Sequence, residues 1–388
     1  MKKVIGVISV ILCIAVLLSG CSVTLNPETI DKIVSNISDS STDIAVLEEN
    51  YNGKDNYYYS SLDEKGKKEY SKIYNGYMNL KDFTVDLTRD ELDYMFNCVL
   101  YDNPEIFWVD STYSFSKSPR GLFVEPDYRC DSEEIKTKTA ELKAAVNRVV
   151  ALSGSRNSDY NQEKFFHDYI CKNTVYDLST YDGFGDTAYS VFFDGKAICE
   201  GYARAMKMLL DEVGIYSYLV VGETENEAGQ IEGHMWNVVS VDGELYHVDL
   251  TWDDYDGELG EISYLYFNMT DEDIRKDHFD IVPYDNNCTS QKFNYFNVNG
   301  LMFNSFNDFN GMASVCANGL NEYLILEIRF SDDDDYEAIK TKALNNETDR
   351  AFFDFTVDVA LASGKNISSK SYIYNDDFNY LCIVFEKG

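Results

Sequence analysis

The central stretch of the chain reads Ile198-Cys199-Glu-Gly-Tyr202-Ala-Arg-Ala205-Met206-Lys-Met-Leu209-Leu210-Asp-Glu-Val213-Gly214, which predicts an amphipathic helix that begins at Cys199. Its apolar side chains recur at helical spacing, and Gly214 stands where a C-terminal cap is expected. Cys199 would then lie in the first turn. The partial positive charge of a helix N-terminus favours thiolate over thiol, so this position suits a nucleophile.

A β-hairpin is predicted downstream of this helix. Two β-prone runs, residues 234–241 and 244–250, flank the dipeptide Asp242-Gly243, which is a strong signal for a two-residue turn. If this turn closes the hairpin, the numbers of opposed residues sum to 485. His234 and Asp249 then become diagonal neighbours on one face, with a carboxylate near one imidazole nitrogen and the other nitrogen left for a thiol.

Three motifs in this region resemble those of the transglutaminase-like superfamily of papain-type cysteine acyl-transfer enzymes. They are Gly195-Lys-Ala-Ile-Cys199-Glu-Gly-Tyr-Ala203, Gly233-His234-Met-Trp-Asn237 and Tyr246-His-Val-Asp249-Leu-Thr-Trp-Asp253. The resemblance covers roughly residues 160–255, and it implies that Cys199, His234 and Asp249 act as nucleophile, base and orienting group. Met235 is a mild departure, since a typical member has Ala or Val after the motif His.

Other interpretations of these residues stay open. A cysteine in an apolar helix and a histidine on a strand are often packing residues. Cys199, His234, His247 and Asp249 are all permitted zinc ligands, but the chain lacks the paired C-x2-C or H-x3-H spacing of a zinc site. His247 also competes as the base, because it lies on the same predicted face. Hairpin geometry favours His234, and the resemblance strengthens that assignment. We expect no metal and no cofactor.

The oxyanion formed in acyl transfer needs hydrogen-bond donors. We expect the backbone N–H at the helix start to be one donor. Tyr189 is the candidate for the other, because family members resemble this chain in having a Tyr about ten residues before the nucleophile, with simple packing as the alternative. Trp236 and Trp252 flank the motif His and Asp, and are expected either to wall the site or to belong to the core. His167, in an apolar helix, and His278, in a charged loop, are expected to be structural or solvated.

The N-terminus resembles a bacterial lipoprotein signal. Two lysines precede an apolar run from Val4 to Leu18, which is short for a membrane span and ends in Leu18-Ser-Gly-Cys21. The resemblance implies cleavage before Cys21 and lipid on its thiol, with an uncleaved anchor helix as the alternative. We therefore expect a protein outside the cytoplasm, tethered to the bacterial cell membrane.

The composition agrees with an exported globular protein. Of 388 residues, 45% are hydrophobic and 14% aromatic, which is ample for sizeable cores. A formal charge of −34 opposes binding to nucleic acid or to anionic lipid surfaces. Six of the nine cysteines remain once Cys13, Cys21 and Cys199 are set aside, and their spacing permits disulfides without showing a compact framework.

The pattern predicts an α+β protein with a papain/transglutaminase-like catalytic domain. The predicted segments are a signal peptide (1–20), a polar spacer (21–50), an N-terminal α+β domain (51–152), the catalytic domain (159–285) and a small C-terminal α+β domain (286–388).

Local signals predict elements in the flanking domains. Thr88-Arg-Asp-Glu91 is a capping box that opens a helix, and Asn103-Pro104 ends it. The other predicted elements are a strand at 106–109, a helix at 132–152, a strand at 323–330, helices at 332–344 and 348–362, and a strand at 380–385.

The predicted function is cleavage or transfer of an acyl group from a peptide-type amide, through a thioacyl intermediate on Cys199. With water as acceptor the enzyme would be a protease or amidase, and with an amine a cross-linking transglutaminase. Because water needs no dedicated site and the sequence marks no amine channel, hydrolysis is favoured. The substrate would be a peptide or protein amide, cell-wall amides included. A catalytically silent surface binding module is the alternative from another class.

Overall fold

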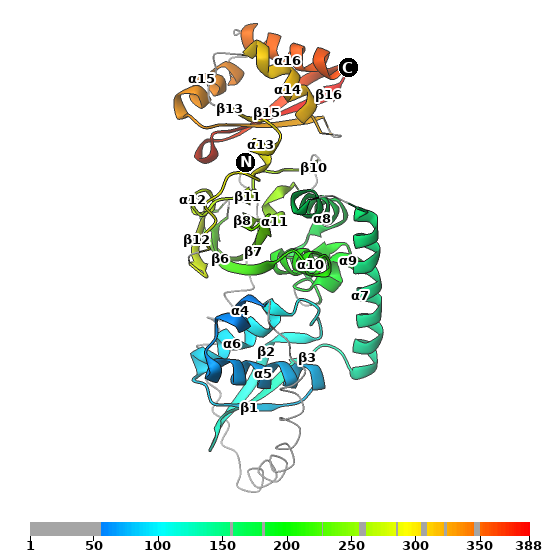
Figure 1. The fold of residues 1–388 in the computed structure, drawn as a ribbon, viewed down its shortest axis with the longest axis vertical. Coiled ribbons are helices and arrows are strands. Elements are labelled where there is room, and N and C mark those ends of the chain that lie inside the picture. Colours follow the sequence, from blue (N-terminus) through cyan, green and yellow to red (C-terminus); the bar gives the residue numbers. More distant parts are fainter. Residues whose placement is uncertain are drawn as a thin grey trace.

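The structure is a computed structural model that describes residues 56–388 apart from residues 156–157, 181–182, 227, 256–260, 285, 304–308, 322–323 and 345–349. Three units follow one another along the long axis of the molecule, from blue at one end to red at the other (Figure 1). Each unit contains both helices and sheet, which confirms the predicted α+β class. The predicted signal peptide and spacer, with Cys21, lie outside the described residues.

The first unit packs three helices against a three-stranded antiparallel sheet. Its elements are α4 (Tyr57–Ser61), α5 (Glu64–Asn79), β1 (Phe83–Val85), α6 (Arg89–Asp102), β2 (Val109–Ser118) and β3 (Gly121–Tyr128), with strand order β1-β3-β2. The predicted capping box is present, because the Thr88 hydroxyl accepts from Glu91 N and the Glu91 carboxylate accepts from Thr88 N. The predicted helix end at Asn103 is confirmed.

The predicted strand at 106–109 is wrong. Only Val109 belongs to a strand, and residues 106–108 form an irregular buried segment. Trp108 Nε1 donates to Tyr77 O within the first unit, whereas Ile106 O accepts from Arg204 of the second unit. This run is apolar because it is packed between two units, and a short apolar run cannot be told from a strand by periodicity.

Helix α7 (Ser132–Ser153) connects the first unit to the second and runs along the side of the molecule (Figure 1). It confirms the predicted helix over 132–152. Its N-terminus carries a capping box formed by Asp131 and Glu134. The helix therefore begins at a defined residue and can hold the two units at a fixed spacing.

The second unit contains the three motifs and is built on a five-stranded antiparallel sheet of order β11-β8-β7-β6-β12. The strands are β6 (Ser217–Glu225), β7 (Ile231–Val241), β8 (Glu244–Val248), β11 (Phe267–Met269) and β12 (His278–Val282). The main helices are α8 (Asp159–Asn173), α9 (Ala188–Phe193) and α10 (Cys199–Glu212). Shorter elements are β4 (Val175–Tyr176), η2 (Leu178–Thr180), β5 (Lys196–Ala197), α11 (Leu250–Asp253), β9 (Asp254–Tyr255), β10 (Glu261–Ile262) and α12 (Asp271–Ile274).

The β7–β8 hairpin has the predicted register. Its opposed pairs run from Val241 and Glu244 to Asn237 and Val248, and the numbers of each pair sum to 485. The turn residues Asp242 and Gly243 have φ values of 54° and 83°, as this type of two-residue turn requires. Strand β8 ends at Val248, however, so the predicted pairing of Asp249 with Trp236 is wrong, and Asp249 instead caps α11.

The third unit packs helices on a four-stranded sheet of order β13-β14-β16-β15. Its elements are α13 (Tyr295–Val298), β13 (Met302–Phe303), α14 (Phe309–Gly319), β14 (Ile325–Phe330), α15 (Asp333–Leu344), α16 (Arg350–Ser363), β15 (Ile367–Asn375), η4 (Asp376–Phe378) and β16 (Tyr380–Lys387). All four predicted elements of this region are present, and the predicted starts of the strand at 323 and of the second helix at 348 lie outside the described residues. Helix α14 and strand β15 had no predicted counterpart.

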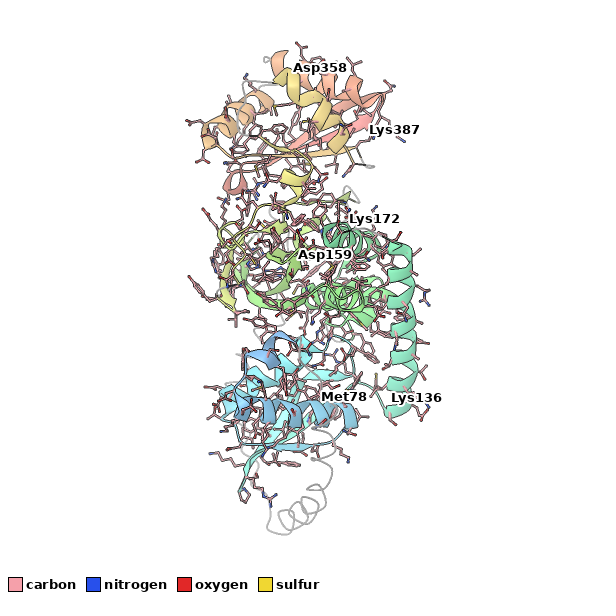
Figure 2. The ribbon with its side chains drawn as sticks, in the orientation of Figure 1. Met78, Lys136, Asp159, Lys172, Asp358 and Lys387 are labelled. Carbon is pink, nitrogen blue, oxygen red and sulfur yellow. The ribbon has the colours of Figure 1, made fainter. Side chains whose placement is uncertain are left out.

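Side chains fill the space between the ribbons of all three units (Figure 2), and one hydrophobic cluster extends through them. The seven cysteines in the described part of the chain are all buried, and none forms a disulfide. Within the same residues, no helix is both long and apolar enough to cross a membrane.

Several carboxyl groups lie in this interior. Burial raises the pKa of Glu163 to about 8 and that of Glu327 to about 7. A group whose pKa is raised on folding binds its proton more tightly in the folded state, so its contribution to stability is lost as pH rises from the unfolded to the folded pKa. We therefore expect the protein to unfold more easily at pH 8.5 than at pH 5.5.

Glu163→Gln tests this expectation. Asn268 Nδ2 donates to Glu163 Oε2 at 3.0 Å, and no described residue hydrogen-bonds the other Glu163 oxygen or Asn268 Oδ1. A glutamine amide can accept from Asn268 Nδ2 and donate to Asn268 Oδ1, and it does not ionise. The variant should therefore be more stable than wild type by about 2 kcal/mol at pH 8.5, and the two proteins should be nearly equal in stability at pH 4.5. The measurement is the urea midpoint at both pH values, with exposed Glu125→Gln as control. Equal destabilisation by Glu163→Gln at both pH values would contradict the argument.

Candidate active site

Cys199 is the first residue of α10, as predicted, and its exposed fraction is only 4%. The backbone N–H groups in the first turn of a helix have no partner within the helix, so they are available to stabilise an oxyanion. Gly201 lets this helix start pack closely on the preceding segment, because a Cβ there would lie 2.4 Å from Gly185 O. Close packing thus explains why the Cys-Glu-Gly sequence has a glycine at this position.

Two contacts hold the start of α10 against the sheet. Asn237 Nδ2 on β7 donates to Ala203 O at 2.9 Å. Cys199 and Ala203 also form an apolar cluster with Leu219 of β6 and Met235 of β7. Met235, the departure from the family motif, therefore packs in the cluster that contains the candidate nucleophile and leaves the arrangement intact.

The first unit contributes to the surroundings of this cluster. Tyr101, near the end of α6, packs against it from the first unit. Tyr58 OH donates to Leu219 O at 2.8 Å, and the rings of Tyr57 and Tyr218 stack with centroids 4.1 Å apart. The first unit is therefore docked directly beside the candidate nucleophile.

His234 and Asp249 form a buried pair. His234 Nε2 lies 2.6 Å from Asp249 Oδ2, and the two side chains are 0% and 1% exposed. The other carboxylate oxygen accepts from Thr251 N at 3.0 Å and Trp252 N at 3.3 Å. Asp249 N donates to Tyr266 O at 3.1 Å. Both the carboxylate and the backbone of Asp249 are thus fixed.

The electrostatics of this pair suit a thiol base. Burial acts to lower the pKa of His234, but the charge and hydrogen bond of Asp249, with a smaller contribution from Cys199, outweigh it and raise the pKa to about 9. Burial would raise the pKa of Asp249, yet His234 holds it below its usual range. Among the described residues, none forms a hydrogen bond of ordinary geometry with His234 Nδ1. That nitrogen is therefore left to serve the nearby thiol.

The structure adds His278 to the site. This residue opens β12 and is buried, so the expectation of a charged loop is wrong. Its Nε2 lies 3.2 Å from Asp249 Oδ2, and its Nδ1 lies 2.7 Å from Asp277 Oδ1. Sequence reasoning missed it because β12 pairs with β6, on the opposite side of the sheet from β8, and no local pattern signals that contact.

His247 has other partners than Asp249. Its Nε2 lies 2.9 Å from Asp271 Oδ1, and its Nδ1 accepts from Trp236 Nε1 at 3.0 Å. Burial lowers the pKa of His247. Because both ring nitrogens are engaged, the geometry favours His234 over His247 as the base.

The residues that could hold a metal in the structure differ from the four possible zinc ligands named from the sequence, which are Cys199, His234, His247 and Asp249. Within the described residues, two sets have donor atoms within 4.8 Å of one another, and they are His234–Asp249–His278 and His247–Asp271–Cys288. Both sets are already joined by hydrogen bonds, which a bound ion would have to replace. Neither set includes Cys199.

Tyr189 has a different partner from the predicted oxyanion. Its hydroxyl donates to Glu141 Oε2 on α7 at 3.3 Å, and its ring stacks on Phe193 with centroids 4.4 Å apart. Lys138 Nζ lies 4.5 Å from the centroid of the same ring. This geometry supports the packing alternative and gives no support to the oxyanion role.

Trp236 and Trp252 lie on two sides of the imidazoles. Their ring centroids are 5.9 and 6.1 Å from that of His234, and each is 4.8 Å from that of His278. Trp236 is fully buried, whereas Trp252 is partly exposed. The two indoles therefore enclose both histidines and limit the access of water.

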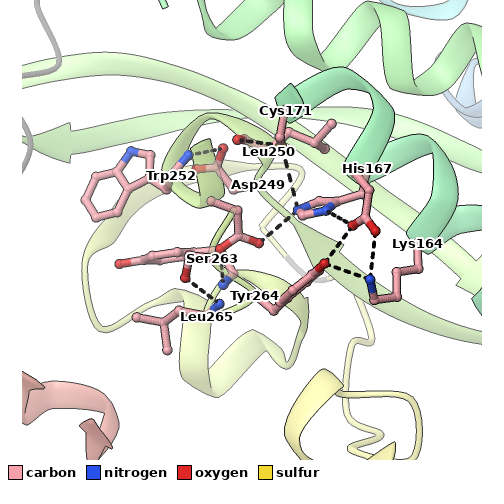
Figure 3. A network of polar contacts seen from close by, with 12 residues as sticks. Lys164, His167, Cys171, Asp249, Leu250, Trp252, Ser263, Tyr264 and Leu265 are labelled. Atoms are coloured by element: carbon pink, nitrogen blue, oxygen red, sulfur yellow. Dashed lines mark hydrogen bonds and ion pairs between the residues drawn. The ribbon is translucent and has the colours of Figure 1, made fainter. Parts of the chain in front are cut away.

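A second polar network supports α11 (Figure 3). His167 Nε2 lies 3.1 Å from Asp253 Oδ2, and His167 Nδ1 lies 3.3 Å from Asp168 Oδ1. Tyr266 N donates to the other Asp253 oxygen at 2.9 Å. The network fixes the last residue of the short helix that Asp249 caps, which fits the structural role expected of His167.

The third unit reaches the same region. Glu327 of β14 accepts from Ser263 Oγ at 2.7 Å, from Tyr264 N at 3.2 Å and from Tyr380 OH at 2.6 Å. Residues 263–266 carry the carbonyl that receives Asp249 N. The third unit therefore holds in place the segment that hydrogen-bonds the Asp249 backbone.

Comparison with known proteins agrees with this geometry. Residues 146–250 match the sequence profile of the transglutaminase-like superfamily, and Cys199, His234 and Asp249 all lie within the match. The chain contains a transglutaminase-like domain. This transglutaminase-like domain includes α8 to α10 and strands β6 to β8. No curated protein matches the chain.

Two solved structures are similar to parts of this chain. One is a TGase, 16% identical over 46% of this chain and 52% of its own, with a TM-score of 0.26. The other is a candidate cysteine protease from Cytophaga hutchinsonii, 11% identical over 36% of this chain and 61% of its own, with a TM-score of 0.24. The matches thus span less than two thirds of either protein.

Proposed function

We propose that the protein is a cysteine enzyme that cleaves or transfers the acyl group of a peptide-type amide, with Cys199 as nucleophile, His234 as base and Asp249 as orienting group. The observation that carries the proposal is the buried His234–Asp249 pair, whose other imidazole nitrogen has no hydrogen bond of ordinary geometry within the described residues, while the Cys199 thiol adds to the rise in the pKa of His234. The transglutaminase-like domain supports the class of enzyme.

The mechanism follows from these positions. The Cys199 thiolate attacks the amide carbonyl carbon, and the negative oxygen that forms accepts hydrogen bonds from N–H groups at the start of α10. The His234 imidazolium gives its Nδ1 proton to the leaving amine as the C–N bond breaks, which leaves a thioester on Cys199. Asp249 stabilises the imidazolium and keeps its ring in place.

The acceptor of the acyl group decides the reaction type. Neutral His234 takes a proton from water, or from an amine, as that acceptor attacks the thioester and releases the Cys199 thiolate. We favour water, because it needs no dedicated binding site, whereas transfer to an amine requires a site that discriminates against water.

We expect release of the free acid to dominate when the thioester forms. Cys199 is acylated with a peptide thioester or activated ester, and products are separated by mass with and without a millimolar primary amine. The carboxylic acid should remain the main product in both cases. If the amide dominates at millimolar amine, the enzyme is a transferase and the preference for hydrolysis is wrong.

We also propose that the protein is a lipoprotein outside the cytoplasm, anchored through Cys21. Support comes from the signal-like segment and its Leu18-Ser-Gly-Cys21 end. Cys21→Ala should abolish incorporation of labelled fatty acid and leave the protein unprocessed. A wild-type mature N-terminus at any residue other than 21 would refute the assignment.

A further inference from the structure

The Asp249 carboxylate serves two histidines. Oδ2 lies 2.6 Å from His234 Nε2 and 3.2 Å from His278 Nε2. Oδ1 accepts from the backbone N–H groups of Thr251 and Trp252. A Cys-His-Asp site needs only one histidine on its carboxylate, so the second calls for a role of its own.

His278 is itself held from several sides. Its Nδ1 lies 2.7 Å from Asp277 Oδ1, and Asp277 Oδ2 in turn accepts from Tyr266 OH at 2.6 Å. The imidazole lies between the two indoles of Trp236 and Trp252. Burial acts to lower the pKa of His278, but the two carboxylates that face its ring nitrogens outweigh burial and raise the pKa to about 9, so below that pH the ring is a cation that donates to both.

The sheet leaves room for this arrangement. His278 pairs with Thr224 on β6, and Gly222, two residues away on that strand, lies opposite His234. A Cβ at Gly222 would come 2.7 Å from the Trp236 ring. A side chain at this point of β6 would therefore collide with the aromatic group that packs against both histidines.

We propose that His278 is a positioning residue, which holds Asp249 Oδ2 in line with His234 Nε2 through a second hydrogen bond. This inference rests on the proposed role of His234 as the base for Cys199. Without His278 the Asp249 carboxylate loses a donor on the oxygen that His234 uses. Only the two backbone donors on Oδ1 and His234 itself then hold the carboxylate, so Oδ2 is less restrained and the His234 imidazolium is less well held.

Several titratable groups besides His278 bear on the choice of variants. The titratable groups that face it are Asp249 at the start of α11, Asp277 next to it in the chain, His234 on β7, His247 on β8 and Tyr266. His278→Gln removes the charge but keeps an N–H donor of similar reach, whereas His278→Ala removes both. His247→Gln is the matched control, because it also alters a buried histidine bonded to an aspartate.

The test measures the alkylation rate of Cys199 by iodoacetamide at pH 6, divided by its rate at pH 10, for full-length protein checked for folding. The ratio reports the thiolate that the imidazolium stabilises and cancels changes in thiol access. It should fall about tenfold in His278→Ala and stay within about twofold of wild type in His278→Gln and His247→Gln. If His278→Ala does not fold, Asp277→Ala replaces it and should lower the ratio at least about threefold.

A wild-type ratio in folded His278→Ala, or in Asp277→Ala where that variant replaces it, would overturn the positioning role. So would an equal fall in His278→Ala and His278→Gln. His234→Ala separates this outcome from failure of the proposed function. If His234→Ala also keeps the wild-type ratio, the base assignment itself is wrong. If only His234→Ala lowers it, the base stands and His278 is structural.

Discussion

Cys199→Ala is expected to abolish acyl-enzyme formation and to lower turnover by more than about 10³-fold, because the proposed mechanism assigns the nucleophile to this thiol. The melting temperature should change little, since the side chain loses only one sulfur atom within a small apolar cluster. The measurement is intact-protein mass after reaction with an activated acyl donor, together with a thermal melt.

Cys316→Ala is the matched control, because it removes another buried, unpaired thiol on α14 of the third unit. This variant should keep full acylation. An acyl adduct that persists in Cys199→Ala would show that the nucleophile lies elsewhere.

His234→Ala is expected to reduce activity as completely as Cys199→Ala. Asp249→Asn should cost less, about 10²- to 10⁴-fold, because it disturbs the orientation and charge of the imidazole without removing the base. The check is kcat/KM for the three variants with one amide substrate. Raised KM with unchanged kcat in His234→Ala would point to a binding role instead.

His247→Ala serves as the comparison within the same hairpin. It removes hydrogen bonds to Asp271 and Trp236, so it should lower the unfolding temperature and leave folded protein active. An essential His247 with a dispensable His234 would reverse the assignment of the base.

The hairpin is the part of the site that local sequence predicts best. Asp242-Gly243 can adopt the two positive φ values of a tight turn, and that turn alone sets the register of β7 and β8. The proximity of His234 and Asp249 follows from this register. The prediction failed only at the end of β8, where Asp249 leaves the strand because its carboxylate caps α11.

The parts that could not be predicted depend on contacts between distant segments. His278 reaches Asp249 because β12 adds to the sheet next to β6, and its charged neighbours in sequence suggested a loop. The family resemblance makes Tyr189 the candidate for an oxyanion donor, but α7 supplies the partner of its hydroxyl. Neither contact leaves a periodic signal in a single sequence.

The most direct test of the central claim is competitive alkylation of the folded wild-type protein at pH 6, with each cysteine followed by peptide mass. Burial raises the pKa of Cys171 to about 11 and that of Cys316 to about 12, so these thiols should be protonated and slow. Cys199, at the start of α10 and beside His234, should be modified first and alone at early times. Equal rates at several cysteines, or an unmodified Cys199 while others react, would contradict the account.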